Sequence, residues 1–311
     1  MATALLLFSE GLDSLLSGLI LKRENIRVIA VRFITPYFGW KYKNRADLFE
    51  EKAKTLGFDH AIVKEITEEY LKVLQNPKYG YGDHANPCID CKIFLFKKAK
   101  ELLISLNADF IATGEILGQR PMSQNKQALE VIEKESGLEG LVLRPLTAKL
   151  LKETVPEKRG LIKRDRLYGH QGRSRNFQLN LAKEFGLREI PTPAGGCLLT
   201  DPIIGSRVLK VIKEKRPLTP LTAELLTFGR HHFEDNLWIV MGRNEEENLR
   251  LKNLLLPHYE LYTLNEPAPY LAVMEGKVSE ELMKNILLKY SKKAQLALSQ
   301  RREIRVVKIA T

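Results

Sequence analysis

A short polar sequence near the N-terminus, Ser-Glu-Gly-Leu-Asp-Ser at positions 9–14, follows the apolar run of residues 4–8 and precedes a helical pattern. A turn from strand to helix leaves backbone N–H groups unpaired at the positive end of a helix dipole, where anions bind. Ser9 and Ser14 can add hydroxyl donors, and Asp13 can hold Mg²⁺ against phosphate oxygens. This pattern predicts a phosphate site; the alternative is a strand-to-helix turn with an ordinary cap.

The chain has 3 cysteines, Cys88, Cys91 and Cys197. An odd number of cysteines, in a sequence that shows no secretory signal, argues against a structural disulfide framework. The Cys-x-x-Cys pair and one distant cysteine are typical of a metal or redox set. The pair falls at the expected start of a helix, whose dipole would stabilise thiolates. Cys197 follows Pro-Ala-Gly-Gly at positions 193–196, where glycines allow close approach of the backbone.

Apolar runs of strand length alternate with helical patterns over the first two hundred residues. The expected strands are residues 4–8, 27–34, 61–63 and 110–112, and the expected helices are residues 12–22, 46–56 and 93–106. Such alternation predicts a doubly wound α/β fold with a parallel sheet. Ligands of these sheets bind beyond the carboxyl ends of the strands, where loops 9–14 and 114–119 fall.

The sequence at positions 9–14 resembles the PP-loop of the adenylating ATP pyrophosphatases, Ser-Gly-Gly-x-Asp-Ser, with Glu10 in place of the first glycine. A carboxylate beside a triphosphate is unfavourable unless it points away or helps to bind a metal. Two later segments are similar to the catalytic domain of tRNA 4-thiouridine synthetases: Thr-Gly-Glu-Ile-Leu-Gly-Gln at 113–119 with Ser123-Gln124, and Arg-Pro-Leu at 144–146. The resemblance covers about residues 1–205.

This resemblance implies an enzyme that adenylates a tRNA uridine with ATP and Mg²⁺ and then replaces oxygen with sulfur. The implied ATP-binding residues are Ser9, Gly11, Asp13, Ser14, Gly114, Gln119 and Ser123. Its expected partners are tRNA and a sulfur donor, which is either a cysteine desulfurase or inorganic sulfide. The expected location is the cytoplasm, because no apolar run reaches the roughly 18 residues of a membrane span. Whether the protein is a homodimer stays open.

Three interpretations of the cysteines compete, and in the first two Cys88, Cys91 and Cys197 are catalytic together with Asp13. The first, which we favour, is a [4Fe–4S] cluster on all three cysteines, as in similar tRNA-thiolating enzymes. The second is a persulfide on Cys197 that Cys88 or Cys91 attacks. The third is structural zinc with His84 as the fourth ligand.

The pattern of apolar and polar residues changes near residue 215. This change predicts a PP-loop domain over 1–205, a linker over 206–220 and an α+β RNA-binding domain over 221–311. The last domain resembles, more weakly, the RNA-binding module of NFACT proteins, through Gly-Arg-Asn at 242–244. 4-Thiouridine synthetases grip tRNA with an N-terminal THUMP domain. In this sequence the PP-loop-like segment begins at residue 9, which leaves no room for a THUMP domain before it. We therefore expect residues 220–311 to bind the tRNA instead.

Basic residues outnumber acidic ones, 49 to 38, which leaves a net charge of +11 and favours a polyanionic partner. Within the basic run 159–175, the candidate RNA contacts are Arg164, Arg166, Arg173 and Arg175. Two rivals remain: an ATP pyrophosphatase acting on a small molecule, and a non-catalytic RNA-binding protein with a degenerate loop.

Overall fold

The computed structural model describes residues 1–191, 196–234, 236–255 and 259–309. It divides the chain into two compact units, which we call unit 1, Met1–Gly205, and unit 2, Ser206–Thr311. Helix α8 (Pro202–Lys213) includes residues 206–213 of the stretch that the sequence predicts as a linker. In the described part of the chain, no helix is long and apolar enough to cross a membrane.

Unit 1 is built on five parallel strands in the order β3-β2-β1-β4-β5, which confirms the doubly wound α/β fold. The strands are β1 (Thr3–Leu7), β2 (Arg27–Ile34), β3 (His60–Glu65), β4 (Phe110–Thr113) and β5 (Val142–Leu143). The sequences of β1 and β2 are nearly continuous apolar runs because both faces of a parallel sheet are buried.

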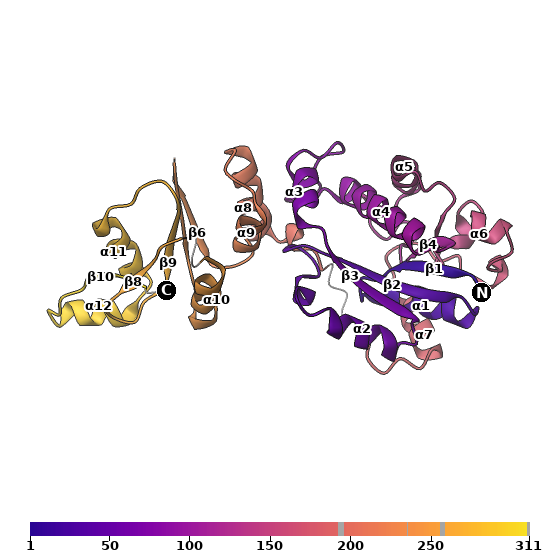
Figure 1. Ribbon diagram of the computed structural model, residues 1–311, viewed down its shortest axis with the longest axis horizontal. Coiled ribbons are helices and arrows are strands. Elements are labelled where there is room, and N and C mark those ends of the chain that lie inside the picture. The colour runs from indigo at the N-terminus through magenta and orange to yellow at the C-terminus, as the bar shows by residue number, and fades with distance from the viewer. Residues whose placement is uncertain (192–195, 235, 256–258, 310–311) are drawn as a thin grey trace. The chain divides into compact units, whose positions relative to one another are not determined.

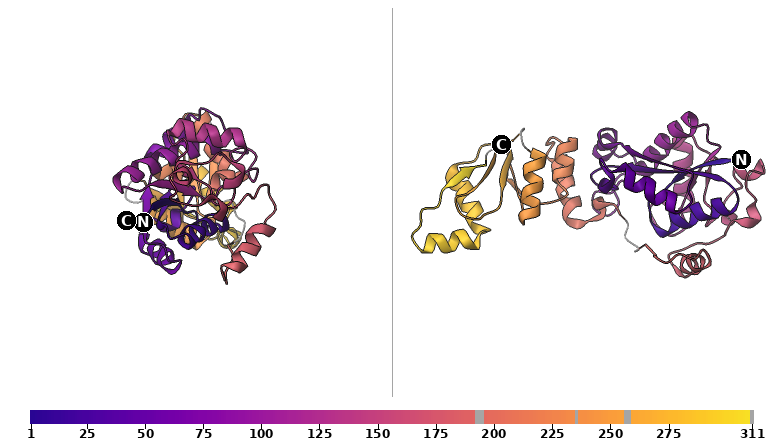
Figure 2. Two further views of the ribbon diagram at one scale, coloured as in Figure 1. Left: turned by 90° about the vertical axis from the view of Figure 1, so that its right-hand side faces the viewer. Right: turned by 60° about the horizontal axis from the view of Figure 1, so that its bottom comes forward.

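Helices cover both faces of this sheet (Figures 1 and 2). The helices of unit 1 are α1 (Leu12–Arg23), α2 (Ala46–Thr55), α3 (Thr67–Gln75), α4 (Cys88–Ser105), α5 (Lys126–Ser136), α6 (Val155–Lys158) and α7 (Asn176–Glu184). Successive side chains of β1 enter different cores: Leu6 packs with α1, α2 and α7, and Leu5 packs with α4 and α5. Because successive side chains of a strand point to opposite faces of the sheet, β1 contacts the helices of both layers.

Loops 9–14, 35–39 and 114–119 follow the carboxyl ends of β1, β2 and β4. Since the three strands are neighbours and parallel, these loops share one edge of the sheet. This edge is where a doubly wound sheet binds its ligands.

Unit 2 is an α+β unit with an antiparallel sheet in the order β10-β8-β9-β7-β6, as the sequence predicts in class. Its strands are β6 (Arg230–Glu234), β7 (Leu237–Met241), β8 (Leu261–Leu264), β9 (Leu271–Glu275) and β10 (Val306–Lys308). Its other helices are α9 (Pro220–Leu225), α10 (Glu245–Leu255), α11 (Glu280–Lys289) and α12 (Lys292–Ser299). A core that includes Ile239, Leu271 and Leu287 holds the sheet against α11 and α12.

A candidate nucleotide pocket beside a cysteine group

Loop 9–14 is held in shape by its own polar groups. The Oγ atoms of Ser9 and Ser14 lie 3.1 Å apart, and the Ser14 hydroxyl donates to the Gly11 carbonyl oxygen at 2.9 Å. Gly11 is the N-cap of α1, and no side chain caps this helix end. The first N–H groups of α1 therefore remain available for an anion.

The segment 113–119 packs directly against loop 9–14. A Cβ atom on Gly114 would lie 2.4 Å from the backbone nitrogen of Ser14, so only glycine allows this approach. The Gln119 amide donates from Nε2 to Oδ2 of Asp13 at 2.9 Å. Ser123 is nearly fully buried behind this loop, and the Gly118 N–H donates to the Gln124 carbonyl oxygen. The structure thus places six of the seven residues that the sequence assigns to ATP in contact with one another, all except Ser123. Of the seven, only Ser9 and Gly11 line the pocket described below.

Glu10 has a backbone φ of +64°, in the left-handed region that favours glycine. Its buried carboxylate accepts hydrogen bonds from Lys52 Nζ at 2.8 Å, from the Tyr42 hydroxyl at 2.6 Å and from Lys41 Nζ at 3.2 Å. Burial alone would raise the pKa of Glu10, but these hydrogen bonds from Lys52, Tyr42 and Lys41 hold it below its usual value. The carboxylate is therefore ionised and neutralised within unit 1.

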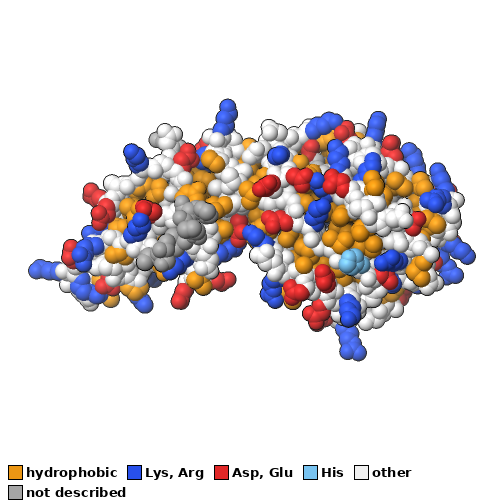
Figure 3. Space-filling view, viewed as in Figure 1, with side chains coloured by type: hydrophobic (Ala, Val, Ile, Leu, Met, Phe, Trp, Pro, Cys, Tyr) orange, Lys and Arg blue, Asp and Glu red, His pale blue; other side chains and the backbone are white. Residues whose placement is uncertain are grey.

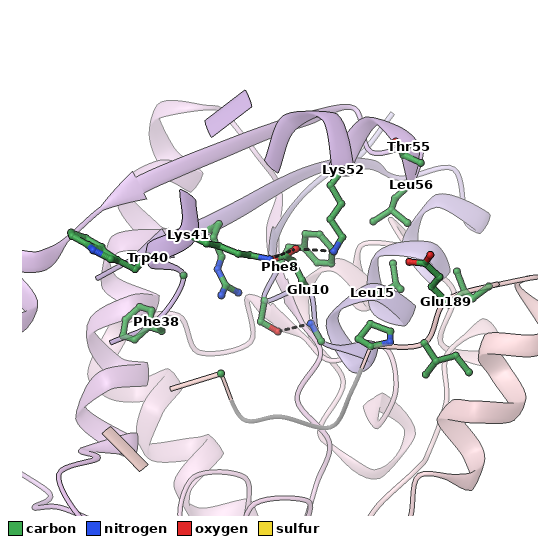
Figure 4. Close-up of a pocket in the computed structure, with 18 of the residues that line it drawn as sticks. Phe8, Glu10, Leu15, Phe38, Trp40, Lys41, Lys52, Thr55, Leu56 and Glu189 are labelled. Carbon is green, nitrogen blue, oxygen red and sulfur yellow. Dashed lines mark hydrogen bonds and ion pairs between the residues drawn. The ribbon is translucent and has the colours of Figure 1, made fainter. Parts of the chain in front are cut away.

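A pocket of about 860 Å³ opens beside loop 9–14 (Figure 4). Apolar side chains line much of it, including Phe8, Leu15, Phe38, Trp40 and Leu56. Its charged lining is Glu10, Arg32, Lys41, Lys52, Arg188 and Glu189, an excess of two positive charges. Apolar walls with a few placed cations suit a ligand that has a flat apolar group and an anionic end.

Sequence reasoning missed Arg32, Lys41 and Lys52, which come from β2, the segment after it and α2. No sequence motif predicts these residues, because Lys41 and Lys52 lie 31 and 42 residues after Glu10 in the chain and contact it only in the folded structure. The one available signal was Glu10 itself, since a carboxylate in a phosphate loop needs cations nearby.

Buried ion pairs join segment 113–119 to helix α4. Glu115 pairs with Lys92, the residue after Cys91, and accepts from Arg144 Nε at 2.9 Å; Arg144 also pairs with Glu133. Burial alone would raise the pKa of Glu115, but the charges of Lys92 and Arg144 lower it to about 2. This network fixes the start of α4, and with it the cysteine pair, relative to the end of β4.

Backbone hydrogen bonds bring the segment of Cys197 to the cysteine pair and to the pocket. The Leu198 N–H donates to the Tyr37 carbonyl oxygen at 2.8 Å, and the Ala85 N–H, just before the pair, donates to the Leu199 carbonyl oxygen at 3.3 Å. Gly196 and Leu198, on either side of Cys197, both line the pocket. Residues 193–195 of the glycine-containing motif lie outside the described residues.

The three cysteines are free, and they are close enough to influence one another's ionisation. Burial, together with the nearby Cys197, raises the pKa of Cys91 to about 12. Burial, together with Cys88, likewise raises the pKa of Cys197 to about 11. The expected dipole-stabilised thiolate is therefore wrong for Cys91: α4 does begin at Cys88, but loss of hydration outweighs the dipole.

A resident metal group would need the cysteine side chains to converge on one point. Three sulfur atoms are suitable donors, but among the described residues no group of three or more ligating side chains is arranged to hold a metal ion. With His84 included, the same holds for the zinc alternative. The described side chains, as placed, do not form a metal centre.

The candidate RNA contacts differ in their surroundings. The guanidinium of Arg164 is engaged inside unit 1, with Glu157 at 2.7 Å and with the carbonyl oxygens of Ala148 and Leu151. Arg175 donates to the Pro191 carbonyl oxygen, whereas Arg166 and Arg173 are exposed. The run containing them is tied to segment 113–119, because the Gly172 N–H donates to the Leu117 carbonyl oxygen at 2.8 Å.

The fold and the site define a class: a doubly wound α/β protein whose first strand leads, at the carboxyl edge of the sheet, into a loop that opens a helix without a side-chain cap. More specifically, the chain belongs to the ThiI family (thiamine biosynthesis protein), whose model matches residues 1–157. No protein of curated function matches the chain.

Solved structures resemble the chain at low identity. A 4-thiouridine synthetase in complex with RNA and bound ATP is 19% identical with a TM-score of 0.43, over 68% of this chain and 51% of that one. This chain therefore spans about half the length of that synthetase. A predicted tRNA methyltransferase subunit from Methanocaldococcus jannaschii is 22% identical with a TM-score of 0.33, over 47% of this chain and 69% of that one. NMN synthetase from Francisella tularensis is 10% identical with a TM-score of 0.27, over 70% of this chain and 87% of that one.

Proposed function

We propose that this protein is an ATP-dependent tRNA-uridine sulfurtransferase. The observation that carries the proposal is that Cys197 lies between two residues lining the same pocket that loop 9–14 borders. Cys197 itself does not line the pocket, but its two neighbours bring this segment of the chain to a site suited to a nucleotide. Membership of the ThiI family and the likeness of segments 113–124 and 144–146 to 4-thiouridine synthetases support the same chemistry.

The reaction has two steps. The uridine oxygen attacks the α-phosphate of ATP, which forms an O–P bond and breaks the bond to the β-phosphate, so that pyrophosphate leaves. Sulfur then attacks the activated carbon, and AMP leaves with the original oxygen. Loop 9–14 would hold the pyrophosphate end, and Asp13 would hold Mg²⁺, which offsets phosphate charge. The target base must leave any stack to reach the pocket.

Cys88, Cys91 and Cys197 would carry the sulfur. A cysteine desulfurase would pass sulfane sulfur from its own persulfide to the Cys197 thiol, whereas inorganic sulfide, which is already fully reduced, could supply sulfur only in the cluster route. In the persulfide route, Cys197 bears the transferable sulfur, and a second cysteine releases it by forming a disulfide. The free thiols are compatible with this route, but burial raises the pKa of Cys91 and of Cys197, so that attack requires removal of their protons. A [4Fe–4S] cluster would require the side chains to rearrange around the metal. The visible absorption spectrum of anaerobically purified protein distinguishes the two, since only a cluster absorbs there.

tRNA capture would fall to the basic run 159–175 and to unit 2, the proposed counterpart of the NFACT-type module. On the face of unit 1 in Figure 3, lysine and arginine side chains are distributed around the outline rather than gathered in one patch. Because a basic patch is the usual footprint of a nucleic-acid-binding surface, the proposal for tRNA rests on the net charge of +11 and on the basic run 159–175 rather than on this face.

A small-molecule substrate is the second candidate, and the family description, which refers to thiamine biosynthesis, favours it. The decisive measurement is pyrophosphate release from ATP with and without tRNA. We expect release to depend on tRNA and to be abolished by Asp13→Ala, while Glu50→Ala, which removes an exposed carboxylate from α2, leaves it unchanged. Release that ignores tRNA would refute the proposal in favour of a small substrate.

A further inference from the structure

We propose that Glu10 is a positioning residue that holds Lys41 and Lys52 in place to bind the pyrophosphate end of the nucleotide. This inference rests on the proposed function, because it assumes that the pocket takes ATP. It deepens that function by assigning a phosphate subsite to residues outside loop 9–14.

The backbone of Glu10 adopts a conformation that is unfavourable for a glutamate. Its φ of +64° is a conformation that glycine adopts freely and that a side chain makes unfavourable. The PP-loop pattern has glycine here. A glutamate that keeps this backbone conformation carries a cost, which persists only where the surrounding structure fixes it.

The side chain of Glu10 forms ion pairs that accompany this unfavourable backbone conformation. Glu10 is 9% exposed, and its two carboxylate oxygens reach both lysines: Oε1 lies 2.8 Å from Lys52 Nζ and Oε2 lies 3.1 Å from Lys41 Nζ. The Tyr42 hydroxyl adds a third hydrogen bond from the side of the core. In Figure 4 the Glu10 side chain points toward the two lysines. Two ammonium groups from different elements are thereby held at one place beside the loop.

Pairing stabilises the buried carboxylate of Glu10, but it does not by itself explain why both partner lysines remain exposed to the pocket. The side chains of Lys41 and Lys52 are 64% and 47% exposed, and exposed ion pairs stabilise proteins little. Both lysines line the pocket, with Arg32 beside them. Within the described part of the chain, Arg32 Nε is buried and has no hydrogen-bond partner.

The charges of this group favour an anion. Arg32, Lys41 and Lys52 carry three positive charges against the one negative charge of Glu10, so the group retains an excess of two. A triphosphate tail presents several oxygens to such a group, whereas a single phosphate presents fewer. The lysines should therefore discriminate nucleotides by the number of their phosphates.

The test measures binding of two probes to the whole chain by calorimetry: an α,β-methylene analogue of ATP, which resists cleavage at that bond, and AMP. We expect Lys52→Gln and Lys41→Gln each to weaken binding of the ATP analogue about 10-fold, with AMP affected less than 3-fold. Glu10→Gln, which keeps the size of the side chain and removes its charge, should weaken the analogue about 5-fold. Thermal unfolding without ligand measures any effect on the fold separately.

A double-substitution cycle shows whether Glu10 acts through the lysines. If it does, Glu10→Gln should have a smaller effect in the Lys52→Gln background and little further effect once Lys41 and Lys52 are both replaced by glutamine. Tighter analogue binding by Glu10→Gln would overturn the proposal, because the carboxylate would then only repel phosphate. Equal losses for both probes would overturn it as well, since they indicate a general disturbance of the pocket. A wild-type chain that binds neither probe would instead refute the proposed function.

Discussion

Two features of the structure favour different residue types at position 10. The backbone conformation favours glycine, and the surrounding lysines favour a carboxylate. The departure from the PP-loop pattern is therefore no sign of a degenerate loop. The carboxylate is paired with cations, which accommodates it beside the loop in a way that was not foreseen from the sequence, where only a carboxylate that points away or binds a metal was expected.

The backbone effect can be measured apart from the ion pairs. Glu10→Gly and Glu10→Ala both remove the carboxylate, but only alanine keeps a Cβ in the left-handed region. We expect the glycine variant to be the more stable one by about 1 kcal/mol in urea unfolding.

The same two substitutions at Glu50, within α2, supply the control. There we expect the order to reverse, with alanine more stable than glycine by about 1 kcal/mol, as in ordinary helix interiors. The same order at both positions would show that φ at position 10 is not positive in solution.

At the scale of elements, the sequence predicts the strands that lead to the site most accurately. β2 lies at residues 27–34 as expected, and β1 is shifted by one residue, because a strand buried on both faces reads as an uninterrupted apolar run. β5 and β6 were missed. β5 has two residues, and the sequence of β6, Arg-His-His-Phe-Glu, has no apolar run because this strand lies at the edge of its sheet.

The ion pairs of Glu115 give the end of β4 a distinct response to pH. The pKa of Glu115 is about 2 in the folded chain, against 4.5 ordinarily, so its pairing stabilises the fold above pH 4.5. This stabilisation, roughly 3 kcal/mol, is lost as the pH falls from 4.5 toward 2. We expect Glu115→Gln to lower the free energy of unfolding by about 3 kcal/mol at pH 7 and to flatten its decline in acid.

Denaturant unfolding at several pH values between about 3 and 7 measures this. Glu130→Gln is the matched control, because Glu130 pairs with Lys152 on the surface, where both side chains are more than half exposed. Its effect should be under about 1 kcal/mol at every pH. Identical pH profiles for the two variants would contradict a buried, ionised Glu115.

At the scale of the whole molecule, the sequence motifs predict some residues of the site but not the residues that reach the pocket only through folding. Asp13 and Gln119, in two separate motifs, meet through one hydrogen bond, as their places after neighbouring strands imply. Lys41, Lys52 and Arg32 were not foreseen, because they belong to no motif and reach the pocket only when α2 and β2 pack against β1. The raised pKa of Cys91 was missed for the same reason, since burial is a property of the folded chain.

The net charge of +11 leads to a prediction about tRNA. Replacing the exposed Arg166 and Arg173 together by alanine should weaken tRNA binding. It should also reduce the slope of log affinity against log salt by roughly 1 for each tRNA phosphate that the variant no longer neutralises. Filter binding between about 50 and 200 mM salt would measure both effects.

Arg164→Ala is the internal comparison, because its guanidinium is bonded to Glu157 and to two backbone carbonyl groups. It should lower thermal stability and leave the salt slope unchanged. An unchanged slope in the double variant would remove the basic run from the tRNA-binding surface and leave unit 2 as the remaining candidate.

The link between Glu10 and its lysines also constrains how such a loop can arise in evolution. A glutamate that replaced glycine before the lysines were present would place an uncompensated carboxylate beside the phosphate site, with a strained backbone as well. Lysines at positions 41 and 52, by contrast, are tolerable beside a glycine, because their side chains are largely exposed. The neutral order of substitutions is therefore lysines first and glutamate last. Once the glutamate is fixed, loss of either lysine becomes costly, so the three positions are expected to change together.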